Sequence, residues 1–148
     1  MNEAPKVDVA ITPQSGATNA TATGLIDGLG YNHCTITIWA DSTDATTKQF
    51  TALKITECDT SDGTFADIVA LTGGTATSTS VGFVIPASDT DSEVITLMSV
   101  SLVGRKRYLK VNLTPASNYL FHAIGHLTKG HEMPVSTTEC GVQAVVRG

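Results

Sequence analysis

Four histidines and several acidic residues are the groups in this chain whose chemistry suits a metal ion. His122 and His126 lie four positions apart in YLFHAIGHL, and His131 with Glu132 follows closely. On a helix, a histidine pair with this spacing can bind zinc from one face. On a strand, the two side chains share a face but lie about 13 Å apart, too far to share an ion. Because the surrounding pattern is that of a strand, we expect no metal site.

Two acidic stretches look like cation-binding loops but lack the required spacing. Asp59, Asp62 and Gly63 form one stretch, and residues 89–93, DTDSE, form the other. Neither has the alternating acids and the closing glutamate of a calcium-binding hand. Asp and Gly in such places are typical of hairpin turns, so we expect turns.

The sequence contains no recognisable catalytic motif. It has no GxSxG, no glycine loop of the phosphate-binding kind, and no paired carboxylates in a known frame. The pair Gly73 and Gly74 lies among Thr and Ala, with no lysine behind it. We therefore expect a protein that is not an enzyme and needs no cofactor.

Four of the nine Lys and Arg residues lie together in the stretch GRKRYLKVNLTP. They are Arg105, Lys106, Arg107 and Lys110, in a chain of formal net charge -5. Nucleic-acid-binding domains are normally basic, and Tyr108 alone is too little for a base-stacking platform. No nucleic-acid partner is therefore expected. Two alternatives stay open: a solvated turn whose cations pair with acidic loops, or a contact with an acidic protein surface.

The single tryptophan, Trp39, lies on the polar side of its strand pattern. It is therefore exposed, packed against a loop, or part of an interface. A glycan-binding module would need a row of exposed aromatic residues, and aromatic residues make up only 5% of the chain.

The elements that position these residues are predicted to be β-strands. Apolar residues alternate with polar ones in five segments, 7–11, 34–39, 53–56, 81–85 and 109–113. Longer apolar runs predict more fully buried strands at 65–71, 94–102, 119–127 and 141–146. Turn-rich segments separate the strands, and this spacing is typical of a sandwich or barrel. We predict an all-β fold with a single β-sandwich, for which a jelly roll is one possible arrangement.

The first 24 residues differ from the rest, with two prolines, two glycines and one short strand pattern. They are predicted to form an extended N-terminal arm or the first edge strand, and residues 25–148 the sandwich domain. In an arm, Pro5 and Lys6 are candidates for contacts with a partner protein or a sister subunit.

The bulk composition suits one globular domain. A chain of 148 residues with 41% hydrophobic and 16% charged residues can bury a core and is not disordered by composition. No segment approaches the roughly 20 apolar residues of a membrane span, and MNEAPKVDVAITPQSG lacks the pattern of a signal peptide. We expect synthesis in a cytoplasm, no membrane partner, and reduced, buried thiols at Cys34, Cys58 and Cys140.

Three stretches follow one another in a characteristic order: ADSTDATTKQFTALKITECDTSDGTFADI (40–68), VSLVGRKRYLKVNLTP (100–115) and YLFHAIGHLTKG (119–130). Together they resemble small structural proteins of tailed bacteriophages. In that group a Thr-Ala-Leu-Lys strand leads to an acidic turn, and a Gly-Arg-Lys-Arg-Tyr-Leu turn leads into a later strand. The N-terminal 24 residues and the segment 131–148 have no counterpart in this resemblance.

The resemblance implies a virion component of the head decoration, or cement, type. Such a protein binds the major capsid protein on the outside of the assembled head and stabilises it. Attachment at three-fold lattice points implies a homotrimer, and many copies on one lattice make weak contacts sufficient. In this picture the contacts come from Arg105, Lys106, Arg107, Trp39, Pro5 and Lys6.

Two alternatives to head decoration remain. One is a structural protein of the phage tail, neck or fibre. The other is a glycan-binding β-sandwich module, for which Trp39 would supply the aromatic contact.

Overall fold

A computed structural model describes residues 5–41, 50–86, 93–129 and 144–147. Every regular element in these ranges is a β-strand. In chain order the strands are β1 (Lys6–Ser15), β2 (Ala22–Asp27), β3 (His33–Ala40), β4 (Phe50–Cys58), β5 (Ala66–Gly74), β6 (Phe83–Val84), β7 (Val94–Ser101), β8 (Tyr108–Pro115), β9 (Leu120–Thr128) and β10 (Ala144–Arg147).

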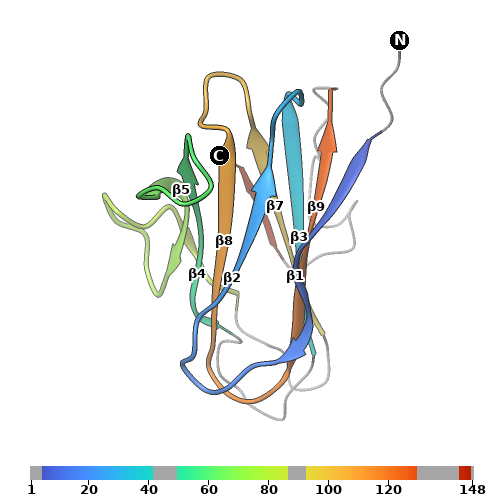
Figure 1. Cartoon of the computed structure of the whole chain (residues 1–148). Helices are drawn as coiled ribbons and strands as arrows, with labels where there is room; N and C mark the ends of the chain where they lie inside the picture. Colours follow the sequence, from blue (N-terminus) through green and yellow to red (C-terminus); the bar gives the residue numbers. More distant parts are fainter. Residues whose placement is uncertain (1–4, 42–49, 87–92, 130–143, 148) are drawn as a thin grey trace.

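The strands form two sheets that pack face to face (Figure 1). Sheet A has the order β1-β9-β3-β7-β10, and sheet B has the order β2-β8-β4-β5-β6. The chain changes sheet at each step from β1 to β4, and again at each step from β7 to β9. Strands β1 to β5 and β7 to β9 thereby have the connectivity of a jelly roll. The predicted all-β fold and single sandwich are confirmed.

The core lies between the two sheets and is filled by alternate residues of each strand. On β3, the side chains of Cys34, Ile36 and Ile38 are buried, and the residues between them are partly exposed. Strand β8 repeats this pattern along its whole length. Aliphatic and β-branched side chains fit such a pleated, half-buried surface, so the alternation seen in the sequence is the one that builds the core.

Three aromatic rings close one end of the core. Phe50 packs edge-on against Phe121 at 5.9 Å and against Tyr119 at 6.0 Å between ring centroids. Burial raises the pKa of the Tyr119 hydroxyl to about 12, and this hydroxyl accepts a hydrogen bond from the Ala116 N–H at 3.3 Å. The buried phenol is therefore neutral and has a partner.

Strand β1 is an edge strand of sheet A. It pairs antiparallel with β9, so the edge-strand alternative holds for Lys6–Ser15, and residues 1–4 lie outside the described ranges. The register slips between Val9 and Ile11 and again between Ile11 and Gln14. Irregularities of this kind hinder an edge strand from pairing with a foreign strand.

Strand β1 also lies directly against β2 across the open side of the sandwich. A Cβ atom added to Gly24 would overlap the carbonyl group of Ala10 and lie 2.9 Å from Cγ1 of Ile11. Glycine is needed here because the two backbones approach so closely. The predicted boundary after residue 24 falls inside β2, so the sandwich begins before that boundary.

Two predicted strands differ from those observed. The apolar run at 65–71 predicts a buried strand, but β5 leaves Asp67, Val69 and Ala70 exposed. The strand predicted at 81–85 is reduced to the two residues of β6. Because so short a strand covers little of its neighbour, β5 lies close to the edge of sheet B and stays partly open to solvent.

Candidate functional site

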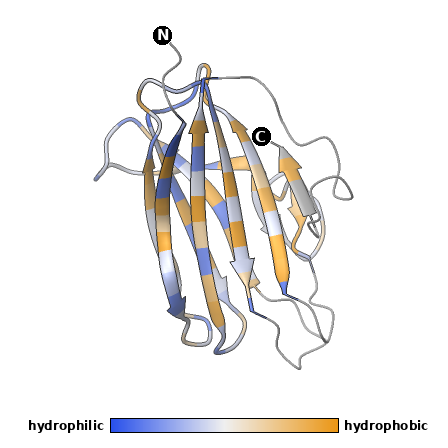
Figure 2. Cartoon of the chain, turned by 90° about the vertical axis from the view of Figure 1, so that its right-hand side faces the viewer, coloured by the Kyte–Doolittle hydropathy of each residue, from blue (hydrophilic) through white to orange (hydrophobic). Residues whose placement is uncertain are grey.

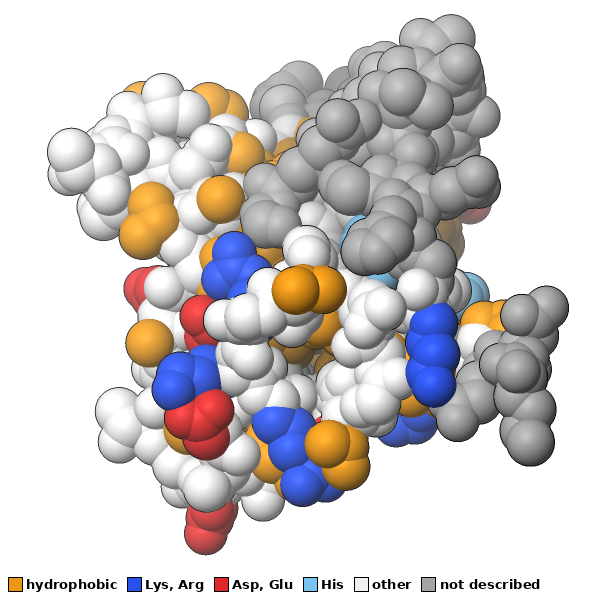
Figure 3. Space-filling model, turned by 90° about the horizontal axis from the view of Figure 1, so that it is seen from above, with side chains coloured by type: hydrophobic (Ala, Val, Ile, Leu, Met, Phe, Trp, Pro, Cys, Tyr) orange, Lys and Arg blue, Asp and Glu red, His pale blue; other side chains and the backbone are white. Residues whose placement is uncertain are grey.

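The basic cluster lies in the turn between β7 and β8. Gly104 in this turn has a φ of 76°, a left-handed conformation that glycine adopts without strain. The N–H of Gly28, in the neighbouring β2–β3 loop, donates to the carbonyl of Arg107 at 2.9 Å and ties the two loops together. We call residues 28–31 and 102–107 the loop end. Figure 3 views the molecule from this end, where cationic, acidic and hydrophobic side chains lie close together.

Two cations of the turn pair with acidic residues at the end of β4 and just beyond it. Nη1 of Arg105 lies 3.4 Å from Oε1 of Glu57. Nζ of Lys106 contacts Oδ2 of Asp59, and the backbone N–H of Lys106 donates to Oε2 of Glu57 at 3.4 Å. These bonds fix the turn against sheet B.

The third cation forms a two-pronged ion pair. Arg107 donates from Nε to Oδ1 of Asp27 at 2.9 Å and from Nη2 to Oδ2 at 2.6 Å. Its guanidinium carbon also lies 4.7 Å from the centre of the Tyr108 ring. The ion pair with Arg107 lowers the pKa of Asp27 from 3.8 to about 2. Partial burial acts in the opposite direction, and a hydrogen bond from the Leu29 N–H lowers the pKa further.

The charges of the loop end are therefore balanced within the chain. Of the two alternatives for the cluster, the turn that pairs with acidic groups matches this geometry, and a contact with an acidic partner stays a prediction. Between the ion pairs, Leu29 and Val103 are each 64% exposed. The loop end thus presents two apolar side chains among paired charges.

The outer face of sheet A is the second notable surface. The strand registers place Val9, Ile124, Thr37 and Leu97 in one row across β1, β9, β3 and β7. Figure 2 looks onto these strands, which lie side by side. A row with three aliphatic side chains in four positions points away from the core.

We call this surface the A face and define it by Val7, Val9, Trp39, Ile95, Leu97 and Ile124. Val7 and Val9 are 58% and 50% exposed, and the other members are partly exposed. The outward-facing positions of the described strands β1, β3, β7 and β9 contain no Asp, Glu, Lys or Arg. The A face therefore combines these apolar side chains with Ser, Thr and His, and it carries no Asp, Glu, Lys or Arg on β1, β3, β7 and β9. The register of β10 places Arg147 beside Ser99 at the edge of sheet A.

The outer face of sheet B has the opposite character. Lys54 pairs with Asp67 at 2.8 Å, and Nζ of Lys110 lies 3.7 Å from the centre of the Phe65 ring. The side-chain amide of Asn112 donates to the carbonyl of Lys110 at 3.1 Å. The outer face of sheet B thus carries charged side chains, whereas β1, β3, β7 and β9 of sheet A carry no Asp, Glu, Lys or Arg outward.

Trp39 lies on the A face and stacks on His122. Their ring centroids are 5.4 Å apart, with 21° between the planes. Trp39 is partly exposed, and its place in an interface stays a prediction. The other predicted contact residues, Pro5 and Lys6, lie at the start of β1, where Pro5 is exposed and Lys6 pairs with Asp8 at 3.3 Å.

The histidines do not gather into a metal site within the described ranges. His122 is taken up by the tryptophan stack, His126 is exposed, and Nε2 of His33 lies 2.7 Å from Oγ of Ser99. Among the residues that the structure describes, no three His, Cys, Asp or Glu side chains come together to hold an ion. His131 lies outside these residues.

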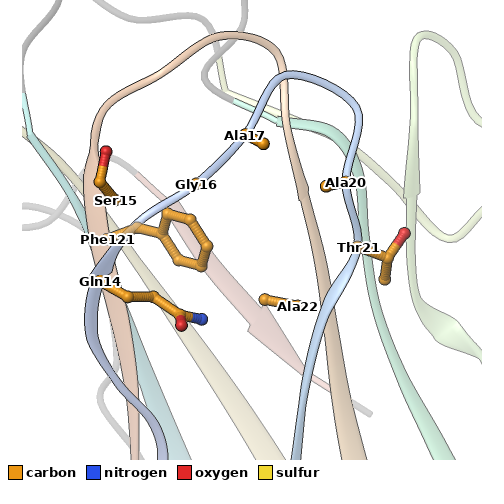
Figure 4. A pocket seen from close by; sticks show the side chains of 8 residues that line it. All are labelled: Gln14, Ser15, Gly16, Ala17, Ala20, Thr21, Ala22 and Phe121. Atoms are coloured by element: carbon orange, nitrogen blue, oxygen red, sulfur yellow. The ribbon is translucent and has the colours of Figure 1, made fainter.

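A small pocket lies at the end of the sandwich opposite the loop end, under the connection between β1 and β2 (Figure 4). Its volume is about 220 Å³, below the roughly 300–1,000 Å³ of typical small-molecule sites. It is lined by Gln14, Ser15, Gly16, Ala17, Ala20, Thr21, Ala22 and Phe121. None of these side chains is an acid or a base, so the lining offers no proton-transfer group.

The two described cysteines are free thiols in different surroundings. Cys34 is buried in the core, and this burial raises the pKa of its thiol to about 12. Cys58 is partly exposed at the end of β4. Both are unpaired with another cysteine in the structure, but the burial expected for each thiol holds for Cys34 and is wrong for Cys58; Cys140 lies outside the described residues.

The chain matches no protein-family model, no curated protein and no solved structure. Within the described residues, no helix is long and apolar enough to cross a membrane. The inference of function therefore depends on the sequence resemblance and on the surfaces themselves.

The A face is a surface that the sequence did not identify. Residues 94–102, VITLMSVSL, form a mainly apolar run, which predicts a strand buried on both sides. In the structure Val94, Thr96 and Met98 are buried, whereas Ile95 and Leu97 point outward and are partly exposed. In a two-sheet fold only one side of each strand faces the other sheet, so apolar residues on both sides of a strand are the available signal for such a face.

Proposed function

We propose that the chain is a non-enzymatic decoration protein of a bacteriophage head. It binds the outside of the assembled capsid, stabilises the capsid, and associates as a homotrimer. The ordered resemblance of its middle and latter segments to small phage structural proteins supports the virion assignment. The observation that carries the mode of action is the loop end, where Leu29 and Val103 stand exposed on a tied pair of loops.

A decoration protein requires a stiff body with an exposed attachment surface. The jelly roll supplies the body, since the inner faces of both sheets are closely interleaved in one core. At the loop end, three ion pairs and the bond from Gly28 to Arg107 hold the turn in place. A surface that is already ordered loses little conformational entropy when it binds.

The loop end fits a contact that is weak for each copy. Two apolar side chains bury little area. The neighbouring cations are already paired with carboxylates of the same chain, so on binding they either keep these partners or exchange them for acidic groups of the capsid. Repetition on a lattice compensates for this weakness, because a trimer bound at one point holds its other copies close to their own sites.

Addition of the purified protein to undecorated, expanded capsids tests the proposal. We expect electron cryomicroscopy to show added density at regular lattice positions on the capsid exterior. Capsids that stay bare at protein concentrations up to about 100 µM, a hundredfold above a micromolar dissociation constant, would reject head decoration. Signal confined to tails or necks would favour the tail-associated alternative.

A matched pair of variants locates the contact. Replacing both exposed apolar side chains of the loop end, Leu29→Ser with Val103→Ser, is expected to lower capsid occupancy at least about tenfold, because less apolar surface is buried on binding. Val69→Ser removes an apolar side chain of 46% exposure from sheet B and serves as the control with unchanged occupancy. Charge reversal at Arg107 is less informative, because it would set two carboxylates against each other at Asp27.

A further inference from the structure

We propose that the A face is the surface through which copies of this chain associate, each packing its A face against a second copy. A contact between two like faces is two-fold, so the inference adds a pairing contact to the homotrimer of the proposed function and names the residues that form it. It rests on the contrast between the two outer faces of the sandwich.

The composition of the A face differs from that of a solvated sheet. An antiparallel sheet with one face in water normally carries polar and charged residues on that face, as sheet B does. The outward positions of β1, β3, β7 and β9 carry Ser, Thr and His but no Asp, Glu, Lys or Arg. Across the A face, Val9, Ile124 and Leu97 instead lie in one register row, with Thr37 between them. Contiguous apolar surface of this kind on a soluble protein marks an interaction site.

The size of the face suits a specific but modest interface. Four strands spaced about 4.8 Å apart, over seven residues of about 3.4 Å each, span roughly 19 by 24 Å. The projected area is then about 450 Å², and side-chain relief increases the accessible area toward the roughly 600–800 Å² per partner of small specific interfaces. We therefore expect association in the micromolar range in free solution.

The charge distribution favours a second copy as the occupant. The chain has a formal net charge of -5, so two copies repel each other unless their charged surfaces point apart. The described A-face strands carry no formal charge outward, so like faces can meet without opposing carboxylates. Recognition of a different protein normally uses complementary charge, and this face has none to offer.

Trp39 supplies the anchor for such a contact. It is the single tryptophan of the chain, lies on the A face beside Ile95 in the register, and is held in one orientation by the stack on His122. Ordered aromatic side chains near the middle of an interface carry much of its binding energy. Association should bury the Trp39 ring further, which gives a direct optical signal for this surface.

The first measurement uses the unmodified protein. Analytical ultracentrifugation from about 1 to 300 µM, a range that brackets the expected micromolar constant, is expected to show monomers that convert to oligomers. Over the same range the emission of Trp39 is expected to shift to shorter wavelength in step with the mass. A mass that stays monomeric at 300 µM overturns the inference, and so does an oligomer whose formation leaves Trp39 emission unchanged.

The second measurement compares matched lysine variants. Val9→Lys with Ile124→Lys puts charge into the middle of the A face, and we expect the dissociation constant to rise at least about 100-fold. Val69→Lys, at a site of 46% exposure on sheet B against 50% for Val9, is expected to associate like the unmodified protein. An unchanged constant in the A-face variant, with its circular dichroism spectrum intact, overturns the inference.

The outcomes separate this inference from the proposed function. Self-association is measured in free solution, and decoration is measured as density on capsids. A chain that stays monomeric in solution but still decorates capsids would refute the A-face contact alone. A chain that oligomerises through the A face but leaves capsids bare would refute decoration alone.

Discussion

The close approach of β1 to β2 makes Gly24 a sensitive point of the fold. In Gly24→Ala, the new methyl group would overlap the carbonyl of Ala10, whereas a carbon and a carbonyl oxygen normally stay about 3.3 Å apart. The edge strand would have to move outward by about 1 Å or more. Overpacking of this kind costs about 1–3 kcal/mol, and the reduced freedom of the unfolded chain returns about 0.5 kcal/mol.

The expected net effect of Gly24→Ala is a loss of about 2 kcal/mol in the free energy of unfolding. For a chain of this length, the midpoint of thermal unfolding should fall by about 4–8 °C. Urea titration followed by circular dichroism, together with a thermal scan, measures both quantities.

Gly74→Ala is the matched control for Gly24→Ala. Its added Cβ would lie 2.8 Å from Cγ1 of Val81, a partly exposed side chain in a turn that can move aside. We expect a smaller loss of stability than in Gly24→Ala. Equal stability of the two variants would refute the conclusion that β1 is held against β2 by direct backbone contact.

Three further predictions concern the core, the ion pairs and the thiols. Phe121→Ala removes the ring that packs at 5.9 Å from Phe50, and should lower the free energy of unfolding by about 3–5 kcal/mol in urea titrations; a loss below 1 kcal/mol would contradict the packing. Because the pKa of Asp27 is lowered to about 2, its contribution is present above pH 3.8 and is lost as the pH falls toward 2. Asp27→Asn should therefore be less stable than the unmodified protein at pH 6, by no more than about 1 kcal/mol after solvent screening, and this difference should shrink at pH 2.5. Peptide mapping after brief alkylation of the native protein should find label on Cys58 and none on Cys34, whose thiol is buried and has its pKa raised to about 12; early label on Cys34 would contradict its burial.

The strands of the core could be predicted because one physical pattern determines them. Apolar residues at every second position, as at Leu109, Val111 and Leu113, give a strand a buried side whatever its neighbours are. The edge position of β5 could not be predicted in the same way. Its run resembles that of a buried strand, but only Ile68 and Leu71 point into the core, and which side of a strand is covered depends on the packing of the two sheets.

The surfaces were less predictable than the core because they combine residues far apart in the chain. The basic cluster stands out in the sequence, but its partner Asp27 is 80 positions from Arg107. The A face requires the registers of β1, β9, β3 and β7, which no local pattern contains. The outward position of Trp39 on β3 could be predicted from its strand pattern, whereas its stacking on His122 could not.

The two ends of the sandwich are held by different forces. The loop end is fastened by three ion pairs that link the β7–β8 turn to β2 and to the end of β4, whereas the rings of Phe50, Tyr119 and Phe121 fill the far end. Added salt screens the first kind of contact and leaves the second nearly untouched. Higher ionic strength should therefore loosen the turn at Arg107 at the loop end, while the packed aromatic rings at the opposite end of the sandwich stay in place.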